Sequence, residues 1–136
     1  MRIDRMTTKS QEALRTSLDA ASRRGNPELL PEHILVAALE QDEGVGAPLV
    51  QKAGGDPKQI VAALNDYVEG LPRAAGGAEP QMSRRGLQLV QKAEDQAKVL
   101  GDEYLSVEHL LLAAVQHDDR IREIFQQQNL TFDQLL

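Results

Sequence analysis

The chain repeats itself once, and this repeat constrains the architecture more than any local propensity does. The segment Glu32-His33-Ile34-Leu35-Val36-Ala37-Ala38-Leu39 returns about 76 residues later as Glu108-His109-Leu110-Leu111-Leu112-Ala113-Ala114-Val115. Further identical residues keep this offset, namely Met6 and Met82, Asp19 and Asp95, Ala21 and Ala97, Gly25 and Gly101, Leu29 and Leu105, and Asp42 and Asp118. We therefore expect two similar halves that contain the same elements in the same order.

The first predicted helix begins at Thr7 or Thr8, where Thr8 and Gln11 fit a capping box, and ends near Gly25. Three apolar residues at helical spacing predict its inward face: Leu14, Leu18 and Ala21. The spacing therefore predicts an amphipathic helix with one side against the core.

Three more helices are predicted in the first half. Pro31 suits the first position of a helix, and the apolar run from there to Leu39 predicts that this second helix is largely buried. Shorter helices are expected over residues 45–53 and 57–71, with the break at Gly54-Gly55-Asp56 between them.

The stretch from Leu71 to Pro80 has Pro and Gly at a density that prevents regular structure. We assign repeat one to residues 1–71, the linker to about 72–82 and repeat two to about 83–136, all within one domain. A chain of 136 residues is long enough for one core.

The second half follows the same pattern. Ser83 and Ser106 suit the caps of its first two helices, and further helices are expected near 119–128 and 131–136. The inward residues of its first helix are expected to be Leu87, Val90 and Ala97. Because no segment alternates as a strand does, we predict an all-α fold of about eight helices in two pseudo-symmetric four-helix repeats.

Composition narrows the range of functions. Hydrophobic residues make up 41% of the chain but aromatic residues only 3%, so the core must consist mainly of Leu, Val, Ile and Ala. The formal net charge of −6 argues against a nucleic-acid partner. The absence of cysteine excludes disulfides and thiolate nucleophiles. No signal peptide or membrane span is apparent, so a soluble, cytoplasmic protein is expected.

The residues offer no catalytic or cofactor motif. His33 and His109 each follow a glutamate, but adjacent helical residues point about 100° apart, which does not suit joint metal ligation. We expect each histidine to make a local hydrogen bond in the first turn of its helix, and His117 to lie at a solvated helix end. No nucleophile elbow or phosphate-binding loop is present, so no enzyme activity, cofactor or metal is predicted.

Two other groups of residues need an interpretation. The pairs Arg23-Arg24 and Arg84-Arg85 are expected to solvate helix faces. Three apolar residues lie near the junction of the halves, namely Val90, Tyr104 and Val107. One interpretation is that they line a groove for an extended or unfolded peptide, and the alternative is that most of them belong to the core.

Taken together, two repeats that each hold a capped helix and a Glu-His helix resemble the Clp amino-terminal family over essentially the whole chain. The opening Met1-Arg2-Ile3-Asp4-Arg5-Met6-Thr7-Thr8-Lys9, and Leu71-Pro72 before the linker, resemble the ClpB branch more than ClpA or ClpC. This resemblance implies a substrate-recruiting domain of a hexameric AAA+ disaggregase that works with the Hsp70 (DnaK) system.

The resemblance also implies functional residues. In ClpB relatives, a Thr at the start of the first helix and an Asp and a Glu around the start of the sixth are associated with substrate handling. The matching residues are Thr7, Asp102 and Glu108. Each also has a purely structural interpretation. Thr7 can cap its helix, Asp102 can shape a turn, and Glu108 can interact favourably with the dipole of its helix.

Two other functions remain open. The domain of a ClpA- or ClpC-type unfoldase docks a folded adaptor instead of an unfolded chain, and proteolysis follows. A small helical hydrolase that uses a Glu-His pair would require bound zinc. Since no ATPase motif occurs, we expect the fragment to be an excised, monomeric binding domain without enzyme activity.

Overall fold

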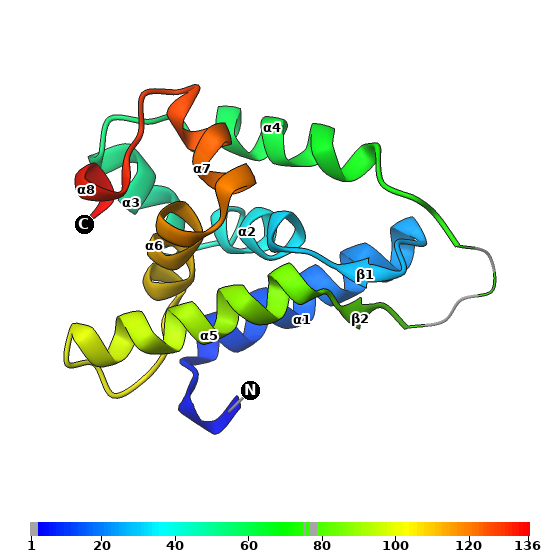
Figure 1. The fold of residues 1–136 in the computed structure, drawn as a ribbon, viewed down its shortest axis with the longest axis horizontal. Helices are drawn as coiled ribbons and strands as arrows, with labels where there is room; N and C mark the ends of the chain where they lie inside the picture. The colour runs from blue at the N-terminus through cyan, green and yellow to red at the C-terminus, as the bar shows by residue number, and fades with distance from the viewer. Residues whose placement is uncertain (1–2, 75, 77–78) are drawn as a thin grey trace.

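The computed structural model describes residues 3–74, 76 and 79–136, which form helices and two very short strands (Figure 1). The elements in chain order are the 3-10 helix η1 (Ile3–Arg5), α1 (Thr8–Arg24), β1 (Glu28–Leu29), α2 (Pro31–Leu39), α3 (Gly46–Lys52), α4 (Pro57–Glu69), β2 (Gln81–Met82), α5 (Arg84–Val99), α6 (Val107–His117), α7 (Asp119–Gln126) and α8 (Phe132–Leu135). The predicted all-α fold of about eight helices is confirmed. None of these helices is both long enough and apolar enough to cross a bilayer.

The helix caps are mostly where the sequence predicts them, with one correction. Thr7, and not Thr8, caps α1, because its Oγ1 accepts a hydrogen bond from the Ser10 backbone N–H at 3.2 Å. The predicted capping box of Thr8 and Gln11 is therefore wrong. Thr8 is already helical, and the Gln11 amide instead donates to the Met6 carbonyl at 3.0 Å.

Helices α2 and α6 form the centre of the molecule, and α1 and α5 pack against them (Figure 1). Nearly every residue of α2 is buried, which confirms the prediction from its apolar run, and most residues of α6 are buried as well. A single cluster of buried apolar residues draws on both halves of the chain, for example on Leu35 and Val50 from the first and on Leu110 and Phe125 from the second. The halves therefore share one core.

Two short parallel pairings join the halves, and the prediction that no strand occurs is wrong at these points. Strands β1 and β2 pair in parallel, with Leu29 opposite Met82. An isolated parallel bridge joins Met6 to Leu105. These two pairs are related by the offset of the repeat, so each half contributes one segment to each pairing. Strands of two residues are too short to show alternation in a sequence.

The inward faces of α1 and α5 differ from those predicted. Ala21, Val90 and Ala97 are buried as expected, whereas Leu87 is 45% exposed, so its prediction is wrong. The inward face of α5 consists instead of Leu89, Val90, Ala93 and Ala97. On α1, Leu14 and Leu18 are only half-buried, because the chain that packs over them leaves a groove.

The predicted linker, about 72–82, includes residues 75, 77 and 78, which lie outside the described residues. Its last two residues form β2. Near its start, the Asn26 amide donates to the Pro72 carbonyl at 3.2 Å, and the Ala74 N–H donates to the Gly25 carbonyl at 2.8 Å. These bonds hold the chain after α4 against the end of α1. The boundaries of the repeats stay a prediction.

The two halves pack closely at Gly86, where there is no room for a side chain. A Cβ atom at this position would lie 2.6 Å from the Met82 Sδ and 3.0 Å from the Leu29 carbonyl oxygen. We expect Gly86→Ala to lower the free energy of unfolding by about 1–3 kcal/mol despite the higher helix propensity of alanine. Urea denaturation measures this loss.

Gly70→Ala is the matched control, because its Cβ would meet only the Tyr67 carbonyl oxygen, at 3.6 Å. This variant should change stability by no more than about 0.5 kcal/mol. If the two variants were equally stable, a close approach of β1 to α5 would be refuted.

Candidate functional site

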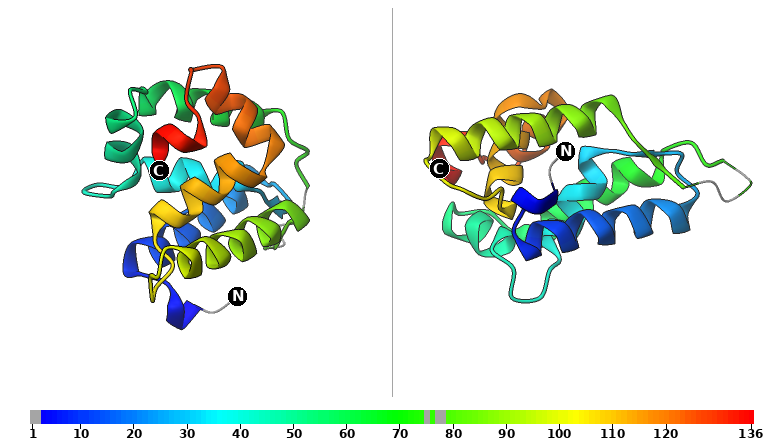
Figure 2. Two further views of the ribbon diagram at one scale, coloured as in Figure 1. Left: turned by 60° about the vertical axis from the view of Figure 1, so that its left-hand side comes forward. Right: turned by 90° about the horizontal axis from the view of Figure 1, so that it is seen from below.

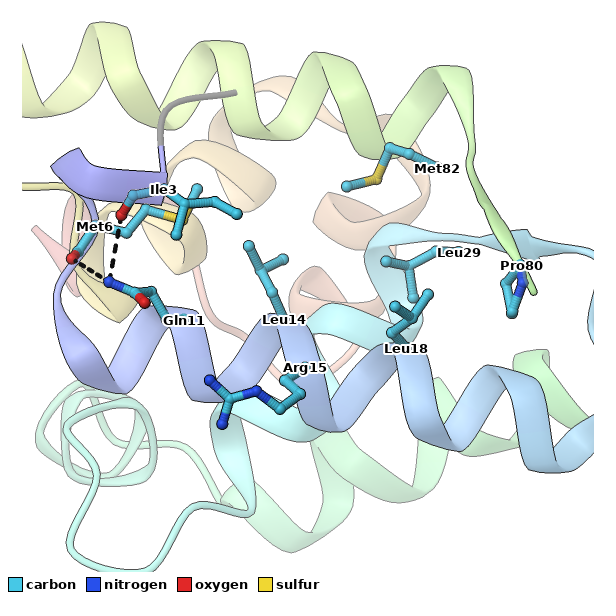
Figure 3. Close-up of a pocket in the computed structure, with 9 residues that line it drawn as sticks. All are labelled: Ile3, Met6, Gln11, Leu14, Arg15, Leu18, Leu29, Pro80 and Met82. Atoms are coloured by element: carbon cyan, nitrogen blue, oxygen red, sulfur yellow. Dashed lines mark hydrogen bonds between the residues drawn. The ribbon is translucent and has the colours of Figure 1, made fainter.

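An apolar groove of about 390 Å³ lies between α1 and the segment that leads into α5 (Figure 3). It is lined by Ile3, Met6, Gln11, Leu14, Arg15, Leu18, Leu29, Pro80 and Met82. The right-hand view of Figure 2 shows the chain of η1 between α1 and α5. Figure 3 shows Ile3 and Met6 at one end of the groove, and Leu29, Pro80 and Met82 at the other. The groove therefore lies at the junction of the two halves.

The sequence builds this groove from residues that the repeat places on either side of the junction. Met6 and Met82 occupy equivalent positions, each just before a helix cap, and each takes part in one of the two parallel pairings. Leu14 and Leu18 lie one turn apart on α1, so their side chains form the floor. Methionine side chains adapt to ligands of different shape. The groove can therefore accept varied apolar side chains.

Two of the lining residues are polar. The Gln11 amide donates to the carbonyl oxygens of Met6 and Ile3, at 3.0 and 3.3 Å, and so holds η1 against α1 (Figure 3). Arg15 is exposed, and its guanidinium makes no hydrogen bond or ion pair with any residue that the structure describes.

The three residues suggested by the family resemblance lie outside the groove lining. Thr7 is partly buried as the α1 cap, Asp102 accepts a hydrogen bond from His109 Nε2 at 2.7 Å, and Glu108 is exposed in the first turn of α6. The Thr7 N–H donates to the Leu105 carbonyl at 2.9 Å, which brings Thr7 to the loop that carries Asp102. Asp102 lines a second, charged hollow of about 330 Å³ with Arg5, Glu94, Ala97, Lys98, Glu103 and Leu105.

Of the three apolar residues predicted to line a groove, two are buried and one is exposed. Val90 and Val107 are 0% and 1% exposed, so a ligand at the surface does not reach them in this conformation. Val107 packs in a small cluster with Ala13, Ala37 and Ala38. Tyr104 is 46% exposed but lies outside the groove lining. The sequence thus located the junction but not the residues that line it.

Both repeated histidines make the local bond expected of them. The Leu30 N–H donates to His33 Nδ1 at 2.9 Å, and the Ser106 N–H donates to His109 Nδ1 at 2.8 Å. Their Nε2 atoms contact Asn26 and Asp102, which are themselves related by the repeat. Within residues 3–74, 76 and 79–136, no cluster of three potential ligands could hold a metal.

One ion-pair network was missed by the sequence reasoning, which placed Arg85 on a solvated face. Its guanidinium donates to both carboxylate oxygens of Glu32, at 3.1 and 2.9 Å, and to both of Asp118, at 3.1 and 2.9 Å. Burial by itself would lower the pKa of Arg85, but the bonds to Asp118 and Glu32 outweigh it and raise the pKa above its ordinary value. The sequence held one sign of this network, because Glu32 lies in a buried apolar run and a buried carboxylate requires a cation as its partner.

We expect Arg85→Met to destabilise the fold by about 3–5 kcal/mol, because it leaves the buried carboxylate of Glu32 without its cation. The double variant Glu32→Gln/Arg85→Met should recover most of this loss in urea denaturation. A double variant as unstable as the single one would show that lost packing, and not the unpaired charge, causes the effect.

His33 makes stability depend on pH. Burial first, and then the charge of Arg24, lower the pKa of His33 from 6.5 to about 4. Between these two values the unfolded chain binds a proton that the folded chain does not, so stability falls as the pH falls through this window. About 3 kcal/mol of stability is lost by pH 4, and the loss levels off below this pH.

Replacing His33 with Asn removes this titration. The stability advantage of the parent over His33→Asn should therefore shrink by about 3 kcal/mol between pH 7 and pH 4, as followed by urea denaturation at several pH values. A constant difference across this range would contradict the lowered pKa.

Comparison with known protein families identifies one match, to the family described as "Clp repeat (R) N-terminal domain", over residues 5–128. The match is to this amino-terminal domain and not to an ATPase domain. Among curated proteins, the chaperone protein ClpB of Corynebacterium efficiens is 39% identical over 129 residues, which cover 93% of this chain and 15% of the relative. ClpB of Mycobacterium tuberculosis strain H37Rv is 39% identical over 119 residues, 87% of this chain and 14% of the relative. The chain thus spans about one seventh of their length.

Solved structures share the fold. The Hsp104 N-terminal domain of Candida albicans superposes with a TM-score of 0.84 at 23% identity, over 96% of this chain and 85% of that one. A chain from a structure described as "Peptide from EAEC T6SS Sci1 SciI protein" gives a TM-score of 0.83 at 27% identity, over 97% and 85%. A complex of the ClpV N-domain with a VipB peptide gives 0.79 at 22%, over 93% and 81%.

Proposed function

Because this chain belongs to the Clp repeat N-terminal domain family of the Clp/Hsp100 chaperones, we propose that its groove captures exposed apolar segments of unfolded or aggregated polypeptides. On this proposal the chain is the substrate-recruiting domain of a ClpB-type disaggregase. The ring that threads the substrate lies in the rest of such a protein.

The apolar groove carries this proposal. A volume of about 390 Å³ suits a few side chains of an extended segment, not the surface of a folded protein. Its lining of leucines and methionines is apolar and adaptable, so it can bind segments of different sequence. The related chains described with peptides support a peptide as the class of ligand.

Thr7, Asp102 and Glu108 stay in the proposal as residues that a bound segment contacts beyond the bridge between Met6 and Leu105. Of the three, only Asp102 lines the charged hollow. Tyr104 is exposed beside them and can contact the same segment. Val90 and Val107 are buried, so in this conformation they act as core residues and do not contact the segment.

We further propose weak binding by each copy of the domain. Six copies on a homohexameric AAA+ ring would raise the effective concentration of binding sites, so that each one can release its segment to the pore. Cooperation with the Hsp70 (DnaK) system and a cytoplasmic location belong to the same proposal, and rest on the similarity to ClpB.

The test is an NMR titration of this domain with a chemically unfolded polypeptide, and separately with the native form of the same polypeptide. We expect shifts at Ile3, Leu14, Leu18 and Met82 with the unfolded form alone. A folded ligand that gives one saturable complex would favour docking of an adaptor instead. No shift with either ligand near millimolar concentration would refute capture by this groove.

Leu18→Glu should weaken binding of the unfolded polypeptide at least tenfold, because it places a charge in the apolar floor. Leu100→Glu is the matched control, since Leu100 is 45% exposed and lies outside the groove. The affinity of Leu100→Glu for the unfolded polypeptide should stay within about twofold of that of the parent domain. Thermal unfolding verifies that both variants are folded, and equal losses in both would argue against the groove.

A further inference from the structure

Among the described residues that line the groove, Arg15 is the only charged one. Its neighbours in the lining are apolar except for Gln11, whose amide nitrogen is already used by η1. Figure 3 shows the Arg15 side chain on α1 beside Leu14 and Gln11. A ligand in the groove would therefore meet one cation and a wall of apolar atoms.

Three other cations near the junction have partners, namely Lys9, Arg85 and Arg5, whereas Arg15 has none among the described residues. Lys9 donates to the Asp42 carbonyl at 2.9 Å and lies 3.8 Å from Glu12. Arg85 is held by two carboxylates, and Arg5 lies 3.7 Å from Glu103. Arg15 makes no hydrogen bond or ion pair with any part of the chain that the structure describes. Its guanidinium is therefore free to bind a carboxylate from another molecule.

We propose that Arg15 makes the groove select apolar segments that carry an aspartate or glutamate over segments that carry lysine or arginine. This inference rests on the proposed function of the groove. A guanidinium binds a carboxylate through two parallel hydrogen bonds. The apolar lining beside it excludes water from one side and so reduces the screening of this interaction.

The net charge of the chain favours basic segments, which is the opposite of the proposed preference. With a net charge of −6, the domain as a whole repels an acidic segment and attracts a basic one. A preference for the acidic segment must therefore come from a local contact. Arg15, which is exposed at the α1 edge of the groove, is the described lining residue that can supply this contact.

The experiment uses two peptides with the same apolar core, one flanked by aspartate and one by lysine, and fluorescence anisotropy to measure their affinities. The aspartate peptide should bind the parent domain about three- to fivefold more tightly. Arg15→Gln should remove this preference, and Arg15→Glu should reverse it. The preference should also decrease as the salt concentration rises.

Arg23→Glu is the matched control, because it makes the same change of charge on the same helix but lies outside the groove lining. It should keep the preference of the parent. If Arg23→Glu reversed the preference as Arg15→Glu does, net charge and not the groove would decide it, and the inference would be wrong.

The two proposals fail in different ways. If both peptides bind the parent domain equally, selection by Arg15 is refuted while capture of apolar segments stands. If neither peptide binds, the groove is not a peptide site, and both the proposed function and the inference are refuted.

Discussion

The fold depends on a reciprocal exchange of backbone pairings between the two halves. The chain before α1 pairs with the chain before α6, and the chain before α5 pairs with the chain before α2. The Thr7 N–H donates to the Leu105 carbonyl at 2.9 Å, and the equivalent Ser83 N–H donates to the Leu29 carbonyl at 3.0 Å. Because each half supplies one segment to each pair, neither half completes its own backbone hydrogen bonds.

The groove is a consequence of this exchange. The two pairings bring the chain ends before α1 and α5 to one side of the molecule, and the methionine before each cap faces the groove. Helix α1 adds two half-buried leucines. The packing that joins the halves thus leaves apolar side chains available where they meet, and this supports an extended polypeptide as the ligand.

The two halves share a backbone arrangement, but side chains at equivalent positions make different contacts. Glu32 is buried against Arg85, whereas its mate Glu108 is exposed. Asn26 bonds His33, and its mate Asp102 bonds His109 with a carboxylate instead. These differences give the described part of the domain an ion-pair network around Arg85 and a charged hollow at Asp102.

The sequence alone determined the family, the helices and most of their caps, because these depend on local spacing and on residues a few positions apart. It also predicted the local bonds of His33 and His109. Only the tertiary structure decided that Arg85 neutralises Glu32, that Val90 and Val107 are buried, and that Met6, Leu18 and Met82 line one groove. These facts depend on contacts between residues far apart in the chain, and periodicity gives the face of a helix but not what packs against it.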